Sequence, residues 1–188
     1  NNLIKSQKKL SIVYDEKKVY FNNSKGDIYA LDKNYGNLIW LTNTRKESEN
    51  LKSFLLKTSK LVLDQDNLYF SNNKNNFFSL DADTGIIEWT QNINSDLKPI
   101  IAQNIIFSIS LEGYLFVIEK STGNIIRITD IFKNNKSRKF NKKSLSGFVV
   151  GSKKIYLSSN AGKLLEIDIG DGKVSSIFRL GKGKISEP

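Results

Sequence analysis

The stretch Ser79-Leu80-Asp81-Ala82-Asp83-Thr84-Gly85-Ile86-Ile87-Glu88-Trp89 decides the fold of this chain, because its pattern recurs along the sequence. One acidic residue stands in each copy and is taken as the repeat origin: Asp32, Asp81, Glu119 and Asp168. An aromatic residue lies twelve positions before every origin, at Tyr20, Tyr69, Phe107 and Tyr156, and a glycine lies four positions after it, at Gly36, Gly85, Gly123 and Gly172. An internal repeat fixes the architecture of a chain before any local motif is considered.

The spacing of the copies predicts the kind of repeat. The origins are separated by 49, 38 and 49 residues, which brackets the roughly 40–50 residues of one four-stranded propeller blade. The sequence therefore predicts an all-β chain, a β-propeller of about four four-stranded antiparallel blades. The blades are expected over residues 11–42, 60–91, 98–129 and 145–178 of a single domain that spans residues 1–188.

The second copy shows how one blade is built. Short runs of β-branched and aromatic residues predict strands over 60–63, 67–71, 76–81 and 86–91. The turn from Asp81 to Gly85 predicts a tight hairpin with the glycine in the left-handed conformation, and the carboxylate can accept hydrogen bonds from the amides of the turn. A second turn is predicted six positions before each origin, where the chain has Gly26, Asn75, Gly113 and Gly162. The repeated acids are therefore expected to be structural.

The composition limits the chemistry that is available. The 188 residues contain no cysteine and no histidine, which removes disulfides, thiolate chemistry and the commonest metal ligand and general base. No apolar run approaches the ~20 residues of a membrane-spanning helix. The formal net charge of +10 invites a nucleic-acid or acidic-membrane interpretation. Most of the bases are Lys in a chain rich in Asn and Ile, so a biased source genome accounts for much of the excess, and no nucleic-acid partner is predicted.

The quoted stretch resembles the tryptophan-docking motif of the pyrroloquinoline-quinone-like (PQQ-like) propeller repeat, Ala-x-Asp-x-x-Thr-Gly-x-x-x-Trp, with Ser79 in place of the alanine. Residues 30–40 match again, with Tyr35 in place of the threonine. At the tryptophan position, eight residues after the origin, the four copies have Trp40, Trp89, Arg127 and Ser176. We expect the two tryptophans to pack across blade boundaries and to donate the indole N–H to the neighbouring backbone, with an aromatic ligand cage as the alternative.

The resemblance also bears on the number of blades. Propellers close with about four to eight blades, and PQQ-like families have seven or eight. Pro99 lies twenty residues before the third origin, and Pro188 stands where a further blade would begin. We therefore expect the chain to be an arc of a larger ring, half of eight blades, with the remaining blades of the same ring as its neighbours. A closed four-bladed ring is the alternative.

Quinoprotein dehydrogenases are the enzymes of this superfamily, so the resemblance calls for a search for catalytic residues. Their quinone needs a charged, metal-assisted pocket on the propeller axis, whereas the acids of this chain lie in periodic turns. The pattern Asp81-x-Asp83-x-Gly85 looks like the start of a calcium loop, but its twelfth position is Asn92 instead of a bidentate glutamate. The sequence predicts no catalytic residue, no cofactor, no metal site and no enzymatic activity.

Among the non-catalytic members the chain is most similar to the BamB family of outer-membrane assembly lipoproteins. The similarity is carried by Gly147-Phe148, by Ser158-Ser159-Asn160-Ala161-Gly162-Lys163-Leu164-Leu165 and by Lys184-Ile185-Ser186-Glu187-Pro188. The resemblance implies a periplasmic scaffold that is anchored to the outer membrane by an N-terminal lipid and binds the periplasmic domains of the assembly machinery. That family binds through inter-blade loops. The long loop 43–60 occupies a comparable place, and its charged residues are the expected protein-binding residues: Arg45, Glu47, Glu49 and Lys52.

A second candidate surface is the basic linker 133–143, which we predict to be exposed, because it mixes like charges with Asn and Ser and has only Phe140 to bury. The residues expected to contact anionic lipid head groups or an acidic partner surface are Lys136, Arg138, Lys139, Lys142 and Lys143. A solvated linker is the alternative. Two other functions stay open for the chain: a periplasmic or cell-surface ligand-binding propeller, and an arc of a PQQ-dependent dehydrogenase.

Overall fold

The repeated sequence folds into four sheets of the same construction. The computed structural model describes residues 11–23, 26–44, 56–133 and 145–181, and all regular structure in these residues is β-strand. Each sheet is antiparallel, with four strands in chain order. The described residues contain no helix that is long and apolar enough to cross a membrane. The predicted all-β propeller fold with four four-stranded blades is confirmed.

The strands of the four blades have the following bounds. Blade 1 contains β1 (Ile12–Tyr14), β2 (Lys18–Asn22), β3 (Ile28–Asp32) and β4 (Leu38–Thr42), and blade 2 contains β5 (Val62–Asp64), β6 (Asn67–Asn72), β7 (Asn76–Asp81) and β8 (Ile87–Gln91). Blade 3 contains β9 (Ile100–Ala102), β10 (Ile105–Ile109), β11 (Tyr114–Glu119) and β12 (Ile125–Asp130), and blade 4 contains β13 (Leu145–Val150), β14 (Lys154–Ser159), β15 (Lys163–Asp168) and β16 (Val174–Arg179).

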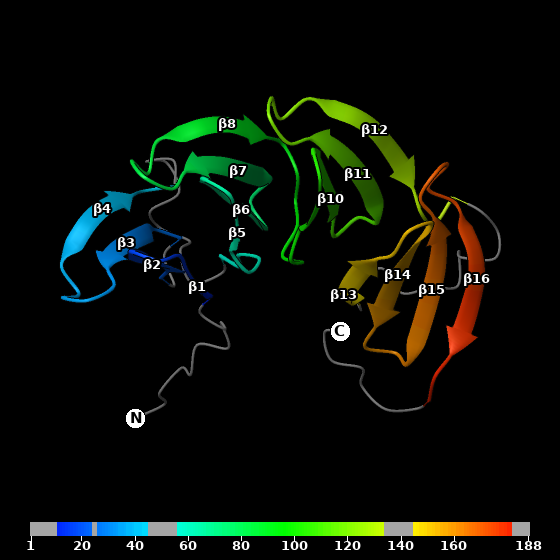
Figure 1. The fold of residues 1–188 in the computed structure, drawn as a ribbon. Helices are drawn as coiled ribbons and strands as arrows, with labels where there is room; N and C mark the ends of the chain where they lie inside the picture. The colour runs from blue at the N-terminus through cyan, green and yellow to red at the C-terminus, as the bar shows by residue number, and fades with distance from the viewer. Residues whose placement is uncertain (1–10, 24–25, 45–55, 134–144, 182–188) are drawn as a thin grey trace.

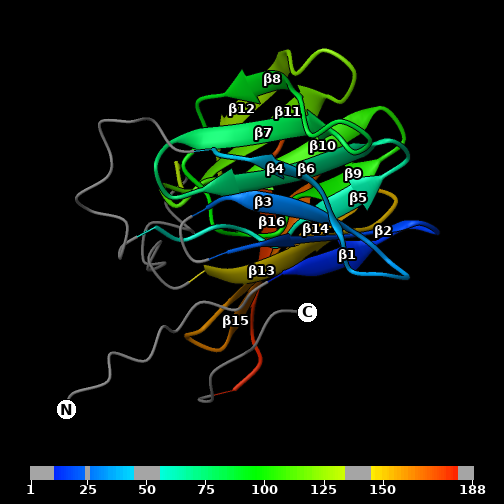
Figure 2. The ribbon, with the colours of Figure 1, turned by 90° about the vertical axis from the view of Figure 1, so that its left-hand side faces the viewer.

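The blades follow one another along an arc (Figure 1), with β4, β8, β12 and β16 on its outer side and the first strand of each blade toward its centre. Blades 1 and 4 form the two ends of the arc, which is open between them. Figure 2, turned by 90°, shows the strands running between the two rims of the arc. The core consists of three apolar clusters, one at each boundary between successive blades.

Equivalent residues of the repeat occupy equivalent places in the sheets. In every blade the aromatic residue pairs with the residue two positions before the origin: Tyr20 with Ala30, Tyr69 with Ser79, Phe107 with Val117 and Tyr156 with Glu166. The register of the outermost strand then shifts directly before the origin in all four blades. This shift is a β-bulge that adds one residue to the outermost strand. The predicted equivalence of the four aromatic residues is confirmed.

The turns of the repeat also have the predicted backbone. The glycines four positions after the origins have φ between 70° and 74°. At the second turn, six positions before the origins, φ is 91° at Gly26, 63° at Asn75, 88° at Gly113 and 71° at Gly162. These are left-handed conformations, which glycine adopts without the steric cost that a Cβ atom brings and which asparagine tolerates.

The two tryptophans connect neighbouring blades. The Nε1 atom of Trp40 in blade 1 donates a hydrogen bond of 3.1 Å to the carbonyl oxygen of Ala82 in blade 2. In the same way, Nε1 of Trp89 donates to the carbonyl of Lys120 in blade 3, at 3.2 Å. Each ring covers the glycine of the next blade so closely that a Cβ atom on Gly85 would lie 2.6 Å from the Trp40 ring. The expected tryptophan strut across the blade boundary is therefore confirmed.

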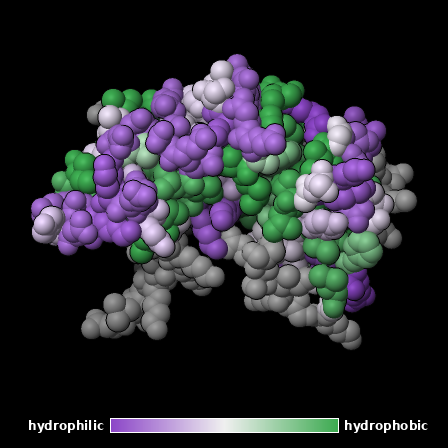
Figure 3. Space-filling view, in the orientation of Figure 1, coloured by the Kyte–Doolittle hydropathy of each residue, from purple (hydrophilic) through white to green (hydrophobic). Residues whose placement is uncertain are grey.

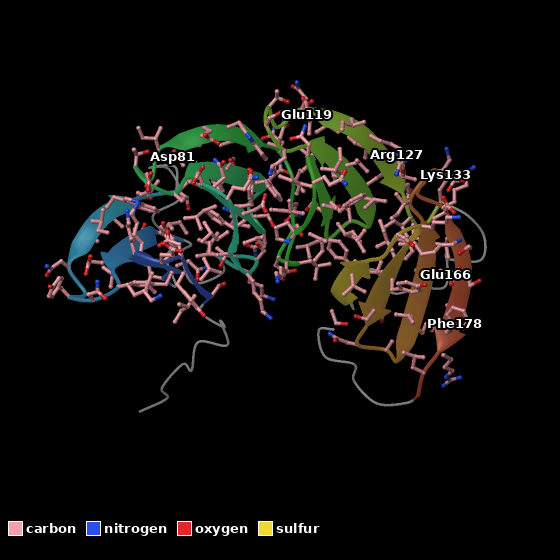
Figure 4. The ribbon with its side chains drawn as sticks, in the orientation of Figure 1. Asp81, Glu119, Arg127, Lys133, Glu166 and Phe178 are labelled. Carbon is pink, nitrogen blue, oxygen red and sulfur yellow. The ribbon has the colours of Figure 1, made fainter. Side chains whose placement is uncertain are left out.

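Arginine replaces tryptophan at the third boundary and makes the same kind of contact. The guanidinium of Arg127 donates from Nη2 to the carbonyl of Ile169, at 2.5 Å, and from Nη1 to the carbonyl of Gly170. Figure 4 shows Arg127 where β12 meets blade 4. The glycine of the next blade, Gly172, is covered by Thr129, whose Oγ1 lies 2.6 Å from the place of a Cβ atom. The third blade boundary is therefore hydrogen-bonded as well, although it has no tryptophan.

Candidate binding surface

The connections between strands lie on two rims of the arc. The turn rim carries the turns between the first and second and between the third and fourth strands of each blade. The loop rim carries the turns between the second and third strands and all connections between blades. In Figure 2 the turn rim is on the right and the loop rim on the left. The turn rim faces the viewer in Figure 3, where its surface is largely hydrophilic.

The acids of the turn rim are used by their own turns. Oδ1 of Asp81 accepts hydrogen bonds from the amide and the hydroxyl of Thr84, both at 2.7 Å, and these bonds hold the pKa of the Asp81 carboxyl below its usual range. Oδ1 of Asp168 accepts from the amide of Gly170 at 2.8 Å, which lowers its pKa as well. Figure 4 shows Asp81 and Glu119 at their turns. A hydrogen-bonded, ionised carboxylate at an exposed turn is not tuned to act as a general base.

Ion pairs join blades on the same rim. Lys18 of blade 1 pairs with Asp83 of blade 2, and Nζ of Lys120 in blade 3 lies 2.7 Å from Oδ2 of Asp64 in blade 2. Asp83 is 79% exposed, so solvent screens its pair and the pair contributes little to stability. No group of three acidic, His or Cys side chains that could hold a metal is present in the described ranges.

Hydrogen bonds fasten the inter-blade connections to the loop rim. Oγ1 of Thr44, which follows β4, donates to the carbonyl of Gly26 at 2.5 Å. The amide of Lys57 donates to Oδ1 of Asn73 at 2.8 Å, and the amide of Asn73 returns a bond of 2.9 Å to the carbonyl of Lys57. The amide of Leu111 donates to the carbonyl of Asn94 at 2.8 Å. The described parts of this rim therefore form a fixed surface.

A polar depression lies on the loop rim between blades 2 and 3. Its volume is about 430 Å³ and it is lined by Asn73, Lys74, Asn75, Asn92, Asn94, Ser110, Glu112, Tyr114 and Phe116. Tyr114 is 38% exposed at its wall. Asn94 donates from Nδ2 to Oε1 of Glu112 at 2.5 Å, while its Oδ1 atom is buried and has no hydrogen-bond partner among the described residues. The depression therefore combines amide, hydroxyl and charged groups around one exposed ring.

The residues singled out from the sequence lie elsewhere. Arg45, Glu47, Glu49 and Lys52 fall outside the described residues, as do Lys136, Arg138, Lys139, Lys142 and Lys143. The described residues that flank these two groups, Thr44 and Lys133, belong to connections of the loop rim, the same rim as the depression. Sequence reasoning missed the depression. Its only signal was the asparagine-rich segment 72–76 together with Asn92 and Asn94, which the fold places beside residues 110–116 of blade 3.

One described acid has a raised pKa. Burial raises the pKa of Asp96, which precedes β9, although the nearby charge of Lys57 acts in the opposite direction. A carboxyl with a raised pKa is a candidate acid or base when it lies in a cleft. Asp96 is not among the residues that line the depression, so its carboxyl lies apart from the polar groups gathered there.

A comparison with protein-family models matches residues 4–129 to the family described as outer membrane protein assembly factor BamB. No curated protein sequence gives a significant match. The crystal structure of BamB from Moraxella catarrhalis superposes with a TM-score of 0.76 at 16% identity, covering 100% of this chain and 54% of that one. The chain therefore spans about half the length of that protein.

Two other solved structures share the fold. The computationally designed Ika8 protein superposes with a TM-score of 0.71 at 11% identity, over 96% of this chain and 52% of that one. A quinohemoprotein alcohol dehydrogenase from Comamonas testosteroni gives 0.69 at 13% identity, over 95% of this chain and 36% of that one. At such identities the likeness shows the propeller fold alone.

Proposed function

The chain belongs to the family of the outer membrane protein assembly factor BamB, and from this premise we propose that it is a non-catalytic protein-interaction scaffold in the assembly of outer-membrane proteins. The proposed place of action is the periplasm, at the outer membrane. The observation that carries the proposal is the loop rim, where a fixed backbone presents a polar depression with Tyr114 at its wall. Binding residues are commonly found on loops that a rigid scaffold positions.

The proposed contact is made by the loop rim with a polar segment of the partner. Tyr114 supplies a large, partly exposed ring with few rotatable bonds, the type of side chain that is enriched among the residues that dominate binding energy. Asn94 holds Oε1 of Glu112 at the lining of the depression, and this carboxylate is an acceptor for a backbone N–H of the partner. The charged residues at 45–52 and 136–143 are proposed to extend this surface toward the partner or toward anionic lipid.

The non-catalytic part of the proposal rests on how the acids are used. Asp81 and Asp168 hold their own turns, and Asp64 and Asp83 pair with lysines. The alternative, an arc of a PQQ-dependent dehydrogenase, has the fold likeness to the alcohol dehydrogenase in its favour. Addition of pyrroloquinoline quinone with calcium is expected to give no binding and no alcohol-dependent dye reduction. Turnover in that assay would replace the scaffold proposal with the dehydrogenase.

The binding proposal is tested by measuring affinity for the periplasmic domains of the outer-membrane assembly machinery of the same organism. Tyr114→Ala is expected to weaken binding about tenfold or more, the effect of losing a central aromatic contact. The matched control is Tyr35→Ala on the turn rim, which removes a tyrosine that is 82% exposed and is expected to leave the affinity unchanged. Equal affinities for both variants and the parent chain would contradict binding through the loop rim.

A further inference from the structure

The outermost strand of each blade has one edge without a strand partner. In every sheet the fourth strand pairs only with the third, so β4, β8, β12 and β16 are edge strands among the described residues (Figure 1). Alternate N–H and C=O groups of an edge strand point away from its sheet and can pair with another extended chain. The side chains along the edge decide whether such pairing is favoured or blocked.

The edge of β12 carries exposed isoleucines. Ile125, Ile126 and Ile128 are 37%, 58% and 52% exposed. Natural proteins protect an edge strand with charged side chains or with proline. In β8, the outermost strand of blade 2, Glu88 and Thr90 stand at the places that Ile126 and Ile128 occupy in β12. The edge of β12 is therefore apolar where that of β8 is polar.

The two charged side chains of β12 bond to backbone groups of the protein. The guanidinium of Arg127 donates to two carbonyls of blade 4. Oδ1 of Asp130 accepts a hydrogen bond of 2.8 Å from the amide of Phe132, in the turn that follows the strand. Neither side chain therefore protects the edge against pairing with a further strand.

The apolar edge continues into the polar depression. Ile128 pairs with Phe116 of β11, and two residues further on, the last residue of β12 pairs with Tyr114. Phe116 and Tyr114 both line the depression. Because paired residues of neighbouring strands lie on the same face of a sheet, Ile128, Phe116 and Tyr114 share one face of blade 3. A chain that runs along β12 toward the loop rim therefore reaches the depression.

Blade 1 has a similar apolar edge that does not lead to the depression. In β4, Leu41 stands at the place of Ile128 and is 50% exposed, and Ile39 stands at the place of Ile126 and is 44% exposed. No described residue of blade 1 lines the depression. The edge of β4 therefore offers a matched control for the edge of β12.

We infer that the outer edge of β12 binds an extended segment of the protein partner by strand addition, and that this segment continues into the depression. The inference rests on the proposed function and names the form in which the partner binds. The backbone of the segment exchanges hydrogen bonds with the outward N–H and C=O groups of β12. Apolar side chains at alternate positions of the segment cover the exposed isoleucines, and the polar residues that follow lie beside Tyr114.

The first test places a charge on the edge. Ile128→Lys is expected to weaken binding to the periplasmic domains of the assembly machinery about tenfold, because it removes an apolar cross-strand contact and puts a lysine where a strand is added. Ile128→Val keeps a β-branched apolar side chain and should bind like the parent chain. Leu41→Lys on β4 is the matched control and is expected to leave the affinity unchanged. Equal affinities of Ile128→Lys and Leu41→Lys overturn the inference.

Hydrogen exchange of the parent chain tests strand addition without any substitution. When the periplasmic domains bind, every second amide of β12 is expected to exchange more slowly, because an added strand bonds to alternate N–H groups. The amides of β4 and β8 should keep their exchange rates. Slower exchange at residues 110–116 without any change in β12 would contradict strand addition.

These measurements separate the inference from the proposed function. If Tyr114→Ala weakens binding and Ile128→Lys does not, binding through the loop rim holds and strand addition to β12 is wrong. If the parent chain does not bind the periplasmic domains, both proposals are wrong.

A second copy of the chain is the rival occupant of the edge, because two apolar edge strands can also pair with each other. Sedimentation of the parent chain is expected to give the monomer mass of 21.3 kDa. Self-association that Ile128→Lys abolishes and Leu41→Lys does not would show that a second copy covers the edge of β12, and it would overturn the inference.

Discussion

Single side chains that bond to the backbone maintain each copy of the repeat. Oδ1 of Asp32 accepts from the amides of Asn34 and Tyr35, at 2.9 and 2.7 Å, in the same way that Asp81 accepts from Thr84. The acid therefore shapes the turn that places the following glycine, and in blades 2, 3 and 4 a side chain of the preceding blade covers that glycine. The repeated acids, which the sequence predicts to be structural, therefore support the blade boundary.

This role predicts a pH dependence at Asp81. The hydrogen bonds from Thr84 lower the pKa of the Asp81 carboxyl in the folded chain. The ionised carboxylate therefore adds stability above the ordinary aspartate pKa of 3.8, and this stability is lost as the pH falls through the lower folded pKa. Thr84→Val removes one of the bonds and is expected to cost about 1 kcal/mol at pH 7. The difference between variant and parent, measured by urea unfolding, should shrink below about pH 4. Thr84→Ser, which keeps the hydroxyl, is the control. A difference of the same size at pH 3 and pH 7 would contradict this role.

Among the strands, the sequence predicted the bounds well where both adjacent strands of the sheet belong to the same blade. It was less accurate for the innermost strand of blade 2, predicted over 60–63 and found as β5 (Val62–Asp64). The reason is that the amide of Leu61 donates to Oγ of Ser11 in blade 1, at 2.8 Å, a partner that no local pattern reveals. The polar depression was missed for the same reason, since its walls come from two blades. Turn glycines and docking tryptophans, by contrast, carry their spacing in the sequence itself.

The Arg127 boundary gives a prediction for one element. Arg127→Ala removes two charge-assisted hydrogen bonds to blade 4 and is expected to cost about 2 kcal/mol of the free energy of unfolding. Hydrogen exchange should then accelerate in β14 and β15 of blade 4 while blade 1 keeps its protection. Arg127→Lys is the matched variant. It keeps the charge but lacks the planar fork that reaches both carbonyls, so an intermediate effect is expected. Uniform acceleration in all four blades would show that the boundary is not local.

In the whole molecule, the described residues form a linear series of blades in which each blade packs on its neighbours in the chain. In such a series, stability is approximately a sum of the stabilities of the repeats and of the boundaries between them. Blade 1 has one boundary within the described residues and blade 2 has two. Weakening the contacts between blades 1 and 2 therefore allows blade 1 alone to unfold. Weakening the contacts between blades 2 and 3 instead uncouples blades 1–2 from blades 3–4.

The pair Trp40→Ala and Trp89→Ala tests this difference. Both tryptophans are partly exposed, so each substitution is expected to cost about 2–3 kcal/mol, below the cost for a fully buried ring. Hydrogen exchange of Trp40→Ala should show lost protection in β2 and β3 alone. Trp89→Ala should broaden the urea transition, because the halves made of blades 1–2 and of blades 3–4 can then unfold separately. Trp→Phe at either position keeps an apolar ring without the N–H donor and should cost less. If both alanine variants unfold in a single sharp transition with protection lost equally in all blades, the four blades behave as one cooperative unit, and the stability of the arc does not reside in separable boundaries.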